Sequence, residues 1–162
     1  MTSYTPLQIE TYRGNVYARD FSEPSSAPNI SFGGIINPAA NNKILLVHKV
    51  RLGSLSSGQN ITMHSYDEAN YPLSGGSNGI NRVLGGGASS ALVRSSSSSP
   101  TLPAAGKVDL ERYFVAAGVM DTLDYTETPI IIPPGSSLWF STSAVNNPLR
   151  CCFIWREKSS VA

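Results

Sequence analysis

The side chains of this chain best suited to chemistry are its only two histidines, His48 and His64. Each lies in a segment with the pattern of a β-strand, and if the two strands pair, the imidazoles could meet across the pair. A metal site of the kind found in jelly-roll oxygenases needs more ligands, and these strands supply neither a third histidine nor a glutamate. We therefore expect ordinary histidines in the core or at its rim, with no metal and no other cofactor.

The two cysteines, Cys151 and Cys152, are adjacent in the sequence. On a strand their side chains would point to opposite faces, so a disulfide between them would distort the backbone. They also lack the C-x-x-C spacing of metal and redox sites. We expect two small buried packing residues.

Three carboxylates, Asp121, Asp124 and Glu127, lie close together in the sequence. They lack the glycine-centred ligand order of a dedicated calcium loop. A solvated loop is the simpler interpretation, and a weak calcium site is the alternative.

The glycine and serine clusters also suggest catalysis at first sight. The segments 75–79 (GGSNG) and 85–87 (GGG) contain no G-x-x-x-x-G-K-[ST], and no strand-turn-helix pattern surrounds them, so phosphate binding is not expected. The serine run 95–99 lacks the G-x-S-x-G of a serine hydrolase. We predict that the chain has no catalytic residues and is not an enzyme.

The two tryptophans, Trp139 and Trp155, fall in segments predicted to be neighbouring strands. Two exposed indole rings there would form a stacking platform for sugars. Trp155 shares the apolar face of its strand, which predicts core packing. Trp139 points away from the face that Leu138 and Phe140 share, which predicts exposure or a place at an interface.

The elements that must position these side chains are strands. The chain contains 14 Gly and 11 Pro, and these residues separate short apolar runs in the manner of an all-β sandwich or barrel. The clearest pattern of strand and turn residues is in 129–157. Prolines flank the β-branched run 130–132, turn residues follow at Pro134-Gly135 and at 146–148, and the segments 137–141 and 149–155 alternate as strands. We predict that this stretch is the closing hairpin of an antiparallel sandwich.

The central strand of the first half is predicted at 43–52, because both of its faces are apolar in the middle. Strict alternation places His48 on one face with Leu46 and Val50, and the segment 60–66 is the predicted antiparallel partner. Residues 67–106 show little periodicity and are predicted to be a long Gly/Ser-rich loop, either a partner-contacting segment or a flexible insertion.

Within that loop, 83–84 and 91–93 are candidates for short strand or single-turn pieces. The segment 108–120 is predicted to be a strand, and 121–128 a polar connection. The total of about eight strands is the number expected of a jelly roll. Residues 1–28 form an N-terminal arm or a pair of edge strands, at 7–12 and 16–19, and residues 29–162 form a single β-sandwich domain.

Charge and hydropathy limit the partners. The 12 basic and 11 acidic residues give a net charge of +1 and are spread along the sequence, whereas nucleic-acid binders normally carry a basic stripe. No apolar stretch approaches the roughly 20 residues that span a bilayer, and the first residues do not resemble a signal peptide. We expect a soluble product made in the cytoplasm, with no nucleic-acid and no membrane partner.

A further indication comes from the order of four motifs. An Asn37-Pro38 turn precedes an apolar strand, a serine-rich middle follows, then I-I-P-P-G at 131–135, and finally a terminal strand ending in W-R-E at 155–157. In this order, the segments 35–52, 91–118 and 129–157 resemble the small β-sandwich capsid decoration (cement) proteins of tailed bacteriophages. The resemblance leaves the first 30 residues and 67–90 unmatched.

The resemblance implies a jelly-roll-like fold, a symmetric homo-oligomer (often a trimer) and attachment to the major capsid protein on the outside of the virion. We therefore predict a structural virion protein that stabilises the shell and is made in the host cytoplasm. The alternative is a receptor- or glycan-binding module of a phage fibre or tail, which would depend on Trp139. A third hypothesis, an enzyme of the cupin kind, would depend on the two histidines.

Overall fold

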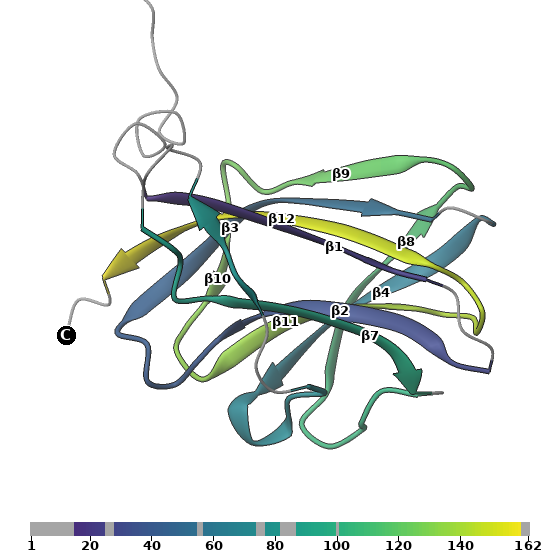
Figure 1. Ribbon diagram of the computed structural model, residues 1–162, viewed down its shortest axis with the longest axis horizontal. Coiled ribbons are helices and arrows are strands. Elements are labelled where there is room, and N and C mark those ends of the chain that lie inside the picture. The colour runs from purple at the N-terminus through teal and green to yellow at the C-terminus, as the bar shows by residue number, and fades with distance from the viewer. Residues whose placement is uncertain are drawn as a thin grey trace, which may run out of the picture.

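The computed structural model describes residues 15–24, 28–54, 57–73, 77–81, 87–99 and 101–159. Within these ranges the chain forms two antiparallel β-sheets that pack as a sandwich, which confirms the predicted fold class (Figure 1). One short 3-10 helix, η1 (Glu68–Asn70), interrupts the strands. The strands are β1 (Val16–Glu23), β2 (Ile30–Asn37), β3 (Lys43–Gly53), β4 (Gln59–Asp67), β5 (Ser77–Asn78), β6 (Ile80–Asn81), β7 (Leu92–Ser99), β8 (Val108–Val115), β9 (Met120–Asp124), β10 (Ile130–Ile132), β11 (Ser136–Thr142) and β12 (Leu149–Ser159).

Strand pairing has a nested order. Sheet 1 runs β10-β3-β12-β1-β6, with β9 also paired to β3, and sheet 2 runs β5-β7-β2-β11-β4-β8. The first long strand pairs with the last, β1 with β12; the second pairs with the second last, β2 with β11; further inward, β3 pairs with β10 and β4 with β8. A long hairpin wound into two layers gives this nesting, and it is the arrangement of a jelly roll.

This topology corrects two sequence predictions about neighbours. The segments 137–141 and 149–155 do not form a hairpin, because β11 belongs to sheet 2 and β12 to sheet 1. The segment 60–66 does not pair with 43–52 for the same reason, since β4 and β3 lie in opposite sheets. The strands themselves were placed correctly, but their connections cross between the sheets.

The glycine pair Gly33-Gly34 does not interrupt β2, which runs through it. A Cβ on Gly33 would lie 2.4 Å from the Phe21 ring, and one on Gly34 would lie 2.5 Å from the indole of Trp139. Both glycines are therefore needed for close packing, one on each face of the strand.

Strands also occupy two segments that were predicted to lack them. The serine run 95–99 belongs to β7, which pairs with β2, and residues 120–124, mostly predicted as a polar connection, form β9 beside β3. Cross-strand pairing thus overrides a composition that favours loops. The predicted pieces at 83–84 and 7–12 lie outside the described residues.

The main core fills the space between the sheets. Its largest members are Phe140, Phe153 and Trp155, together with leucines and valines of β3. A second, smaller cluster of Phe32, Ile36, Tyr66 and Trp139 lies apart from it, and Tyr71, Leu73, Leu92 and Leu102 pack against it. In the described part of the chain, no helix is long and apolar enough to cross a membrane.

A β-bulge in β3 breaks the predicted alternation. Lys49 pairs with Ile154 whereas Val47 pairs with Trp155, so His48 is an extra residue opposite one step of β12. The buried inward side chains therefore change from Leu45 and Val47 before the bulge to Val50 and Leu52 after it. On its other edge β3 changes partner at the same point, from β9 at Lys49 to β10 at Val47.

Candidate functional site: a polar relay, a buried carboxylate and an apolar edge

The two histidines do not meet. His48 lies on β3 in sheet 1 and His64 on β4 in sheet 2, so the prediction that they might approach one another across a strand pair is wrong. Both are buried, as expected of core histidines. No group of three or more His, Cys, Asp or Glu side chains within the described ranges could hold a metal ion.

His64 belongs to a hydrogen-bonded relay that the sequence did not reveal. Its Nδ1 lies 2.7 Å from Asp109 Oδ1 on β8, and its Nε2 lies 2.7 Å from Ser141 Oγ on β11. The ionised Asp109 can only accept, so the neutral imidazole donates from Nδ1–H and accepts the Ser141 hydroxyl at Nε2. Burial lowers the pKa of His64 although Asp109 partly opposes the shift, and the hydrogen bond from His64 lowers the pKa of Asp109.

The order Ser–His–Asp is that of a serine hydrolase, but the exposure is reversed. The reacting hydroxyl of such an enzyme must be accessible while its aspartate is buried. Here Ser141 is only 6% exposed, whereas the Asp109 side chain is 55% exposed. A recess of about 200 Å³ borders Asp109 and Thr62 but is not lined by Ser141. The relay is suited to tying β4, β8 and β11 together, and it does not present a nucleophile.

His48 is buried at the β3 bulge. Neither ring nitrogen makes a hydrogen bond of ordinary geometry with a described residue, so the nearby Thr126 backbone is at most a weak partner. Burial and, next, the nearby Arg156 cation lower the pKa of His48, and Asp124 opposes the shift. The neutral ring therefore fills space beside the segment that follows β9, where Tyr125 N–H donates to the His48 carbonyl at 2.7 Å.

Neither cysteine is in a disulfide, and the prediction of two buried packing residues is confirmed for Cys151 but not for Cys152. Cys151 is fully buried in the main core, and Cys152 is half-buried on the opposite face of β12. Burial raises the pKa of the Cys151 thiol well above its usual value, which keeps it protonated and unreactive.

The three carboxylates at 121–127 do not converge on a metal. Asp124 accepts hydrogen bonds from Thr126 and forms an ion pair with Lys49 at 3.0 Å, and these contacts lower its pKa to about 2. The glycine segment 85–87 lies outside the described residues apart from Gly87, and the segment 75–79 lies partly outside them.

Both tryptophans are completely buried, so the prediction that Trp139 is exposed or at an interface is wrong. Its Nε1–H donates to Ser137 Oγ at 2.8 Å, and its ring packs with Phe32 in the second cluster. Trp155 lies in the main core as predicted, stacked on Tyr17 with ring centroids 6.1 Å apart. The two rings therefore supply no platform for sugars.

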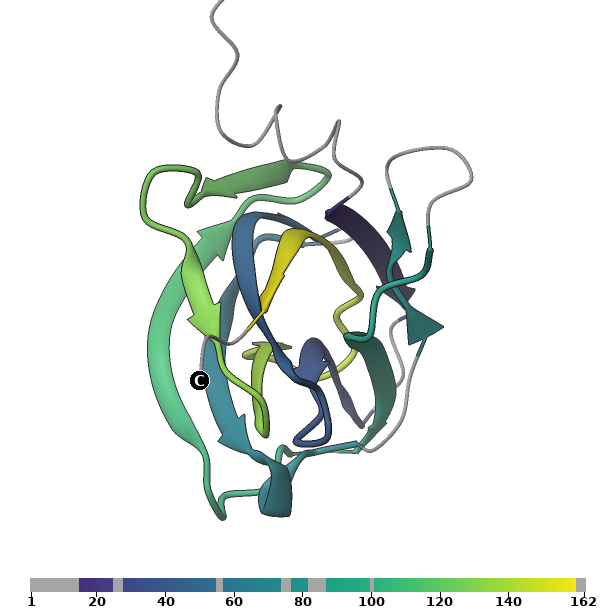
Figure 2. The ribbon, with the colours of Figure 1, turned by 90° about the vertical axis from the view of Figure 1, so that its left-hand side faces the viewer.

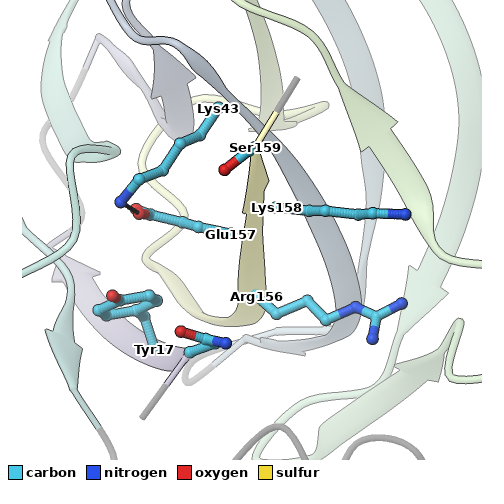
Figure 3. A pocket seen from close by; sticks show the side chains of 7 residues that line it. Tyr17, Lys43, Arg156, Glu157, Lys158 and Ser159 are labelled. Carbon is cyan, nitrogen blue, oxygen red and sulfur yellow. Dashed lines mark hydrogen bonds and ion pairs between the residues drawn. The ribbon is translucent and has the colours of Figure 1, made fainter. Parts of the chain in front are cut away.

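A buried carboxylate, Glu157, is the main polar feature that the sequence analysis missed. It is 8% exposed and accepts hydrogen bonds from Ser89 Oγ and from Ser90 N–H, the latter at 2.9 Å. The Lys43 ammonium lies 2.7 Å away, and Figure 3 shows it reaching the carboxylate from β3. Burial raises the pKa of Glu157, but the hydrogen bonds from Lys43 and Ser89 outweigh it, so the pKa lies below its usual value.

Glu157 lies at one side of a recess of about 390 Å³, which Tyr17, Arg156 and Lys158 also line. Because the carboxylate is already satisfied by its neighbours, it is suited to fastening the 89–91 segment to β12. Continuing the alternation of Phe153 and Trp155 by two residues would have placed Glu157 on the buried face.

Large exposed apolar side chains gather on one side of the sandwich. All of those on described residues lie between positions 108 and 131 except Val145, and they are Val108, Leu110, Phe114, Val119, Met120 and Ile131. Phe114 is 67% exposed and Ile131 is 62% exposed. Figure 2 shows the segments that carry them, in green, together on this side of the molecule. We refer to these six residues as the apolar edge.

The apolar edge includes an unpaired strand. β8 is the last strand of sheet 2 and, among the described strands, pairs only with β4, so no described strand pairs with the other row of its backbone N–H and C=O groups. All of its side chains except Tyr113 and Val115 are exposed. Tyr113 Oη lies 2.8 Å from Tyr125 Oη, which connects β8 to the segment after β9. A long exposed apolar edge strand is a surface suited to a partner chain.

Comparison with known proteins does not assign the chain to a family. No protein-family model matches it, and no curated protein matches it. Among solved structures it is similar to the crystal structure of hydroquinone 1,2-dioxygenase from Sphingomonas sp. TTNP3 with 4-hydroxybenzoate bound, with 12% sequence identity and a TM-score of 0.32. The alignment covers 91% of this chain and 62% of that chain. So weak a likeness carries no argument about activity.

Proposed function

We propose that this chain is a structural virion protein of a tailed bacteriophage, a decoration protein that binds the outside of the capsid and stabilises the shell. The observation that carries the proposal is the apolar edge, because the exposed Leu110 and Phe114 of β8 and the exposed Ile131 of β10 are suited to burial against other chains. The jelly-roll topology agrees with the resemblance of the three segments to decoration proteins, and the buried His64 and Glu157 are held by structural partners.

The apolar edge apart from Met120 is the contact between copies in this proposal. A symmetric oligomer, with a trimer favoured, would cover β8 and the exposed Phe114 and Ile131, and would leave Met120 open on the outer face of sheet 1. The oligomer then presents several identical capsid-binding surfaces, so weak contacts with the major capsid protein add up through avidity. Binding to the assembled shell, and not to free capsid subunits, stabilises the shell by mass action.

The experiment uses the full chain and heads assembled from the major capsid protein of the same phage. We expect the wild type to form an oligomer by light scattering and to co-sediment with heads at saturating, stoichiometric occupancy. The double substitution Phe114→Ser and Ile131→Ser should yield a folded monomer that co-sediments at least about tenfold more weakly, because avidity is lost.

The matched control is Val145→Ser, since Val145 is 49% exposed but lies outside the apolar edge. It should leave both the oligomer and head binding unchanged. The proposed function would be refuted if the wild-type chain does not co-sediment with heads in low salt and at high protein concentration.

A further inference from the structure

Basic side chains collect on the outer face of sheet 1, although they are dispersed in the sequence. On β12 the buried, inward residues are the odd-numbered Cys151, Phe153 and Trp155, so the even-numbered ones point outward. Figure 3 shows Arg156 and Lys158 pointing away from the side that carries Glu157. Cross-strand pairing adds two cations of β3 to the same face. This face, which we call the basic face, carries Lys49, Arg51, Arg150, Arg156 and Lys158.

The charge of the basic face differs from that of the whole chain. Its acidic members are Asp20, which pairs with Cys152, and Asp124, which pairs with Lys49. Five cations and two anions leave a net charge of 5 − 2 = +3 on this face, whereas the chain has a net charge of +1. Lys49 is already held by Asp124, so the unpaired charge is carried by the arginines and Lys158.

A recess gives this face a specific centre. Arg51 and Arg150 line a hollow of about 500 Å³ together with Asp20, Met120 and the half-buried Cys152. Arg150 pairs with Gly53, two residues from Arg51, so the arginines are diagonal neighbours with Cβ atoms about 7 Å apart. Neither arginine forms an ion pair with a described residue.

Gly53 keeps the recess open. A side chain there would stand between Arg150 and Met120, and a Cβ at this position would lie 2.1 Å from Met120 Sδ. The absence of a side chain lets the thioether form an apolar wall next to the two guanidinium groups. Exposed arginines beside an apolar wall are suited to a carboxylate at the end of a short aliphatic side chain.

We propose that the basic face docks against an acidic surface of a partner protein, with an Asp or Glu carboxylate of that partner held between Arg51 and Arg150. This inference rests on the proposed function and deepens it, because it makes the basic face the capsid-binding surface. A protein surface fits better than a nucleic acid. Asp20 and Asp124 interrupt the cations and would repel a continuous phosphate backbone, whereas a protein surface of mixed charge can complement both signs.

The test compares wild type, the double substitution Arg51→Glu and Arg150→Glu, and the control Arg94→Glu. Arg94 is exposed on β7 in the other sheet. Each protein is assayed for co-sedimentation with heads and for binding to immobilised poly-L-glutamate and to duplex DNA. Because the three arginines lie on the surface, all variants should keep the wild-type unfolding midpoint.

We expect the double substitution to weaken binding to heads and to polyglutamate by about tenfold or more, and Arg94→Glu to change it by less than about twofold. Raising the salt concentration should weaken wild-type binding and leave the difference between variants smaller. The double substitution Arg51→Gln and Arg150→Gln should give an intermediate loss, since it removes attraction without adding repulsion.

Failure of this inference can be distinguished from failure of the proposed function. If the wild type binds heads and the Arg51→Glu, Arg150→Glu variant binds them equally well, the inference is overturned while the proposed function stands. If the wild type does not bind heads but binds polyglutamate through the two arginines, the proposed function fails and an acidic protein partner is still supported. Tighter binding to DNA than to polyglutamate would overturn the inference.

Discussion

Replacing Glu157 is the most informative perturbation of the fold, because one side chain joins three segments. The Ser89 hydroxyl accepts from Ala91 N–H at 2.9 Å and from Trp155 Nε1–H at 3.3 Å, so its own hydrogen is committed to Glu157. Ser90 N–H also donates to the same carboxylate oxygen. Lys43 pairs with the other oxygen. Glu157→Ala removes all of these acceptors.

The expected loss of stability on Glu157→Ala follows from the hydrogen-bond donors that are left without an acceptor. Three donors lose their acceptor. The buried Ser89 Oγ–H and the part-buried Ser90 N–H each cost on the order of 1–1.5 kcal/mol, whereas the Ser90 hydroxyl, 3.2 Å from the same oxygen, can rotate toward water and adds little. The Lys43 side chain is 40% exposed, so its ammonium returns to water and adds at most about 0.5 kcal/mol. Glu157→Ala should therefore lower the free energy of unfolding by about 3 kcal/mol. Glu157→Gln keeps one acceptor oxygen and should lose about half of that.

Urea unfolding at neutral pH measures the loss, and amide hydrogen exchange at Ser90 reports whether the local anchor is released. The pKa of Glu157 is lowered in the folded state, so its contribution is present above the usual value of 4.5 and is lost as the pH falls through the folded pKa. The difference between wild type and Glu157→Gln should accordingly shrink below about pH 4.5. Asp124→Asn, at an exposed ion pair, is the control and should leave the unfolding midpoint unchanged.

A loss of less than about 1 kcal/mol for Glu157→Ala would refute the reasoning, since the buried donors would then have found other acceptors. A difference between wild type and Glu157→Gln that persists undiminished at acid pH would refute it too. In that case the stabilisation would not come from the ionised carboxylate.

The remaining predictions concern other buried groups. Burial lowers the pKa of His64 below 6.5, so the unfolded chain binds the proton more readily than the folded one. The free energy of unfolding should therefore fall as the pH drops below about 6.5. His64→Gln should reduce this pH dependence, as measured by urea unfolding at a series of pH values. Trp139→Ala should cost about 3–5 kcal/mol in the same assay, because the indole is fully buried. In a thiol titration of the native protein Cys151 should stay unreactive, and Cys152→Ser should remove any signal that appears before unfolding.

The strands were largely predictable from the sequence, but their partners were not. Alternation in 149–155 correctly identified a strand with one buried face, and prolines correctly limited the strand at 130–132. Turn residues such as Pro134-Gly135, where Gly135 has φ +76°, mark a reversal of the chain without saying whether it stays in one sheet or crosses to the other. The hairpin predicted for 129–157 failed for this reason.

The bulge at His48 is a second feature that the sequence does not predict. A single extra residue shifts the alternation, so Val47 and Val50 both point inward and a strict period of two assigns half of β3 to the wrong face. Nothing in KILLVHKVRL marks the shift, because most side chains around it are apolar. The bulge coincides with the change of partner strand on the other edge of β3, and that pairing is a property of the fold.

The candidate surfaces, too, could be predicted from the sequence only in part. The basic face follows from alternation along 150–158, yet its joining to Arg51 depends on the pairing of β3 with β12. The relay of His64, Asp109 and Ser141 joins three strands that are distant in the sequence, without any motif. A prediction from sequence could have found the outward cations of one strand, but neither of these assemblies.

The relay and the apolar edge are connected through β8, and this connection bears on docking. Asp109 holds one end of β8 to the buried His64, and the Tyr113–Tyr125 contact holds the strand near its other end to the segment after β9. An edge strand fixed at both points loses little conformational freedom when a second chain covers it, so more of the apolar burial is retained as binding energy. Asp109 is also exposed at the edge itself, which places the relay where a neighbouring copy would contact it. In the proposed oligomer, the polar relay would therefore favour assembly by keeping the apolar edge in the shape that a second copy must match.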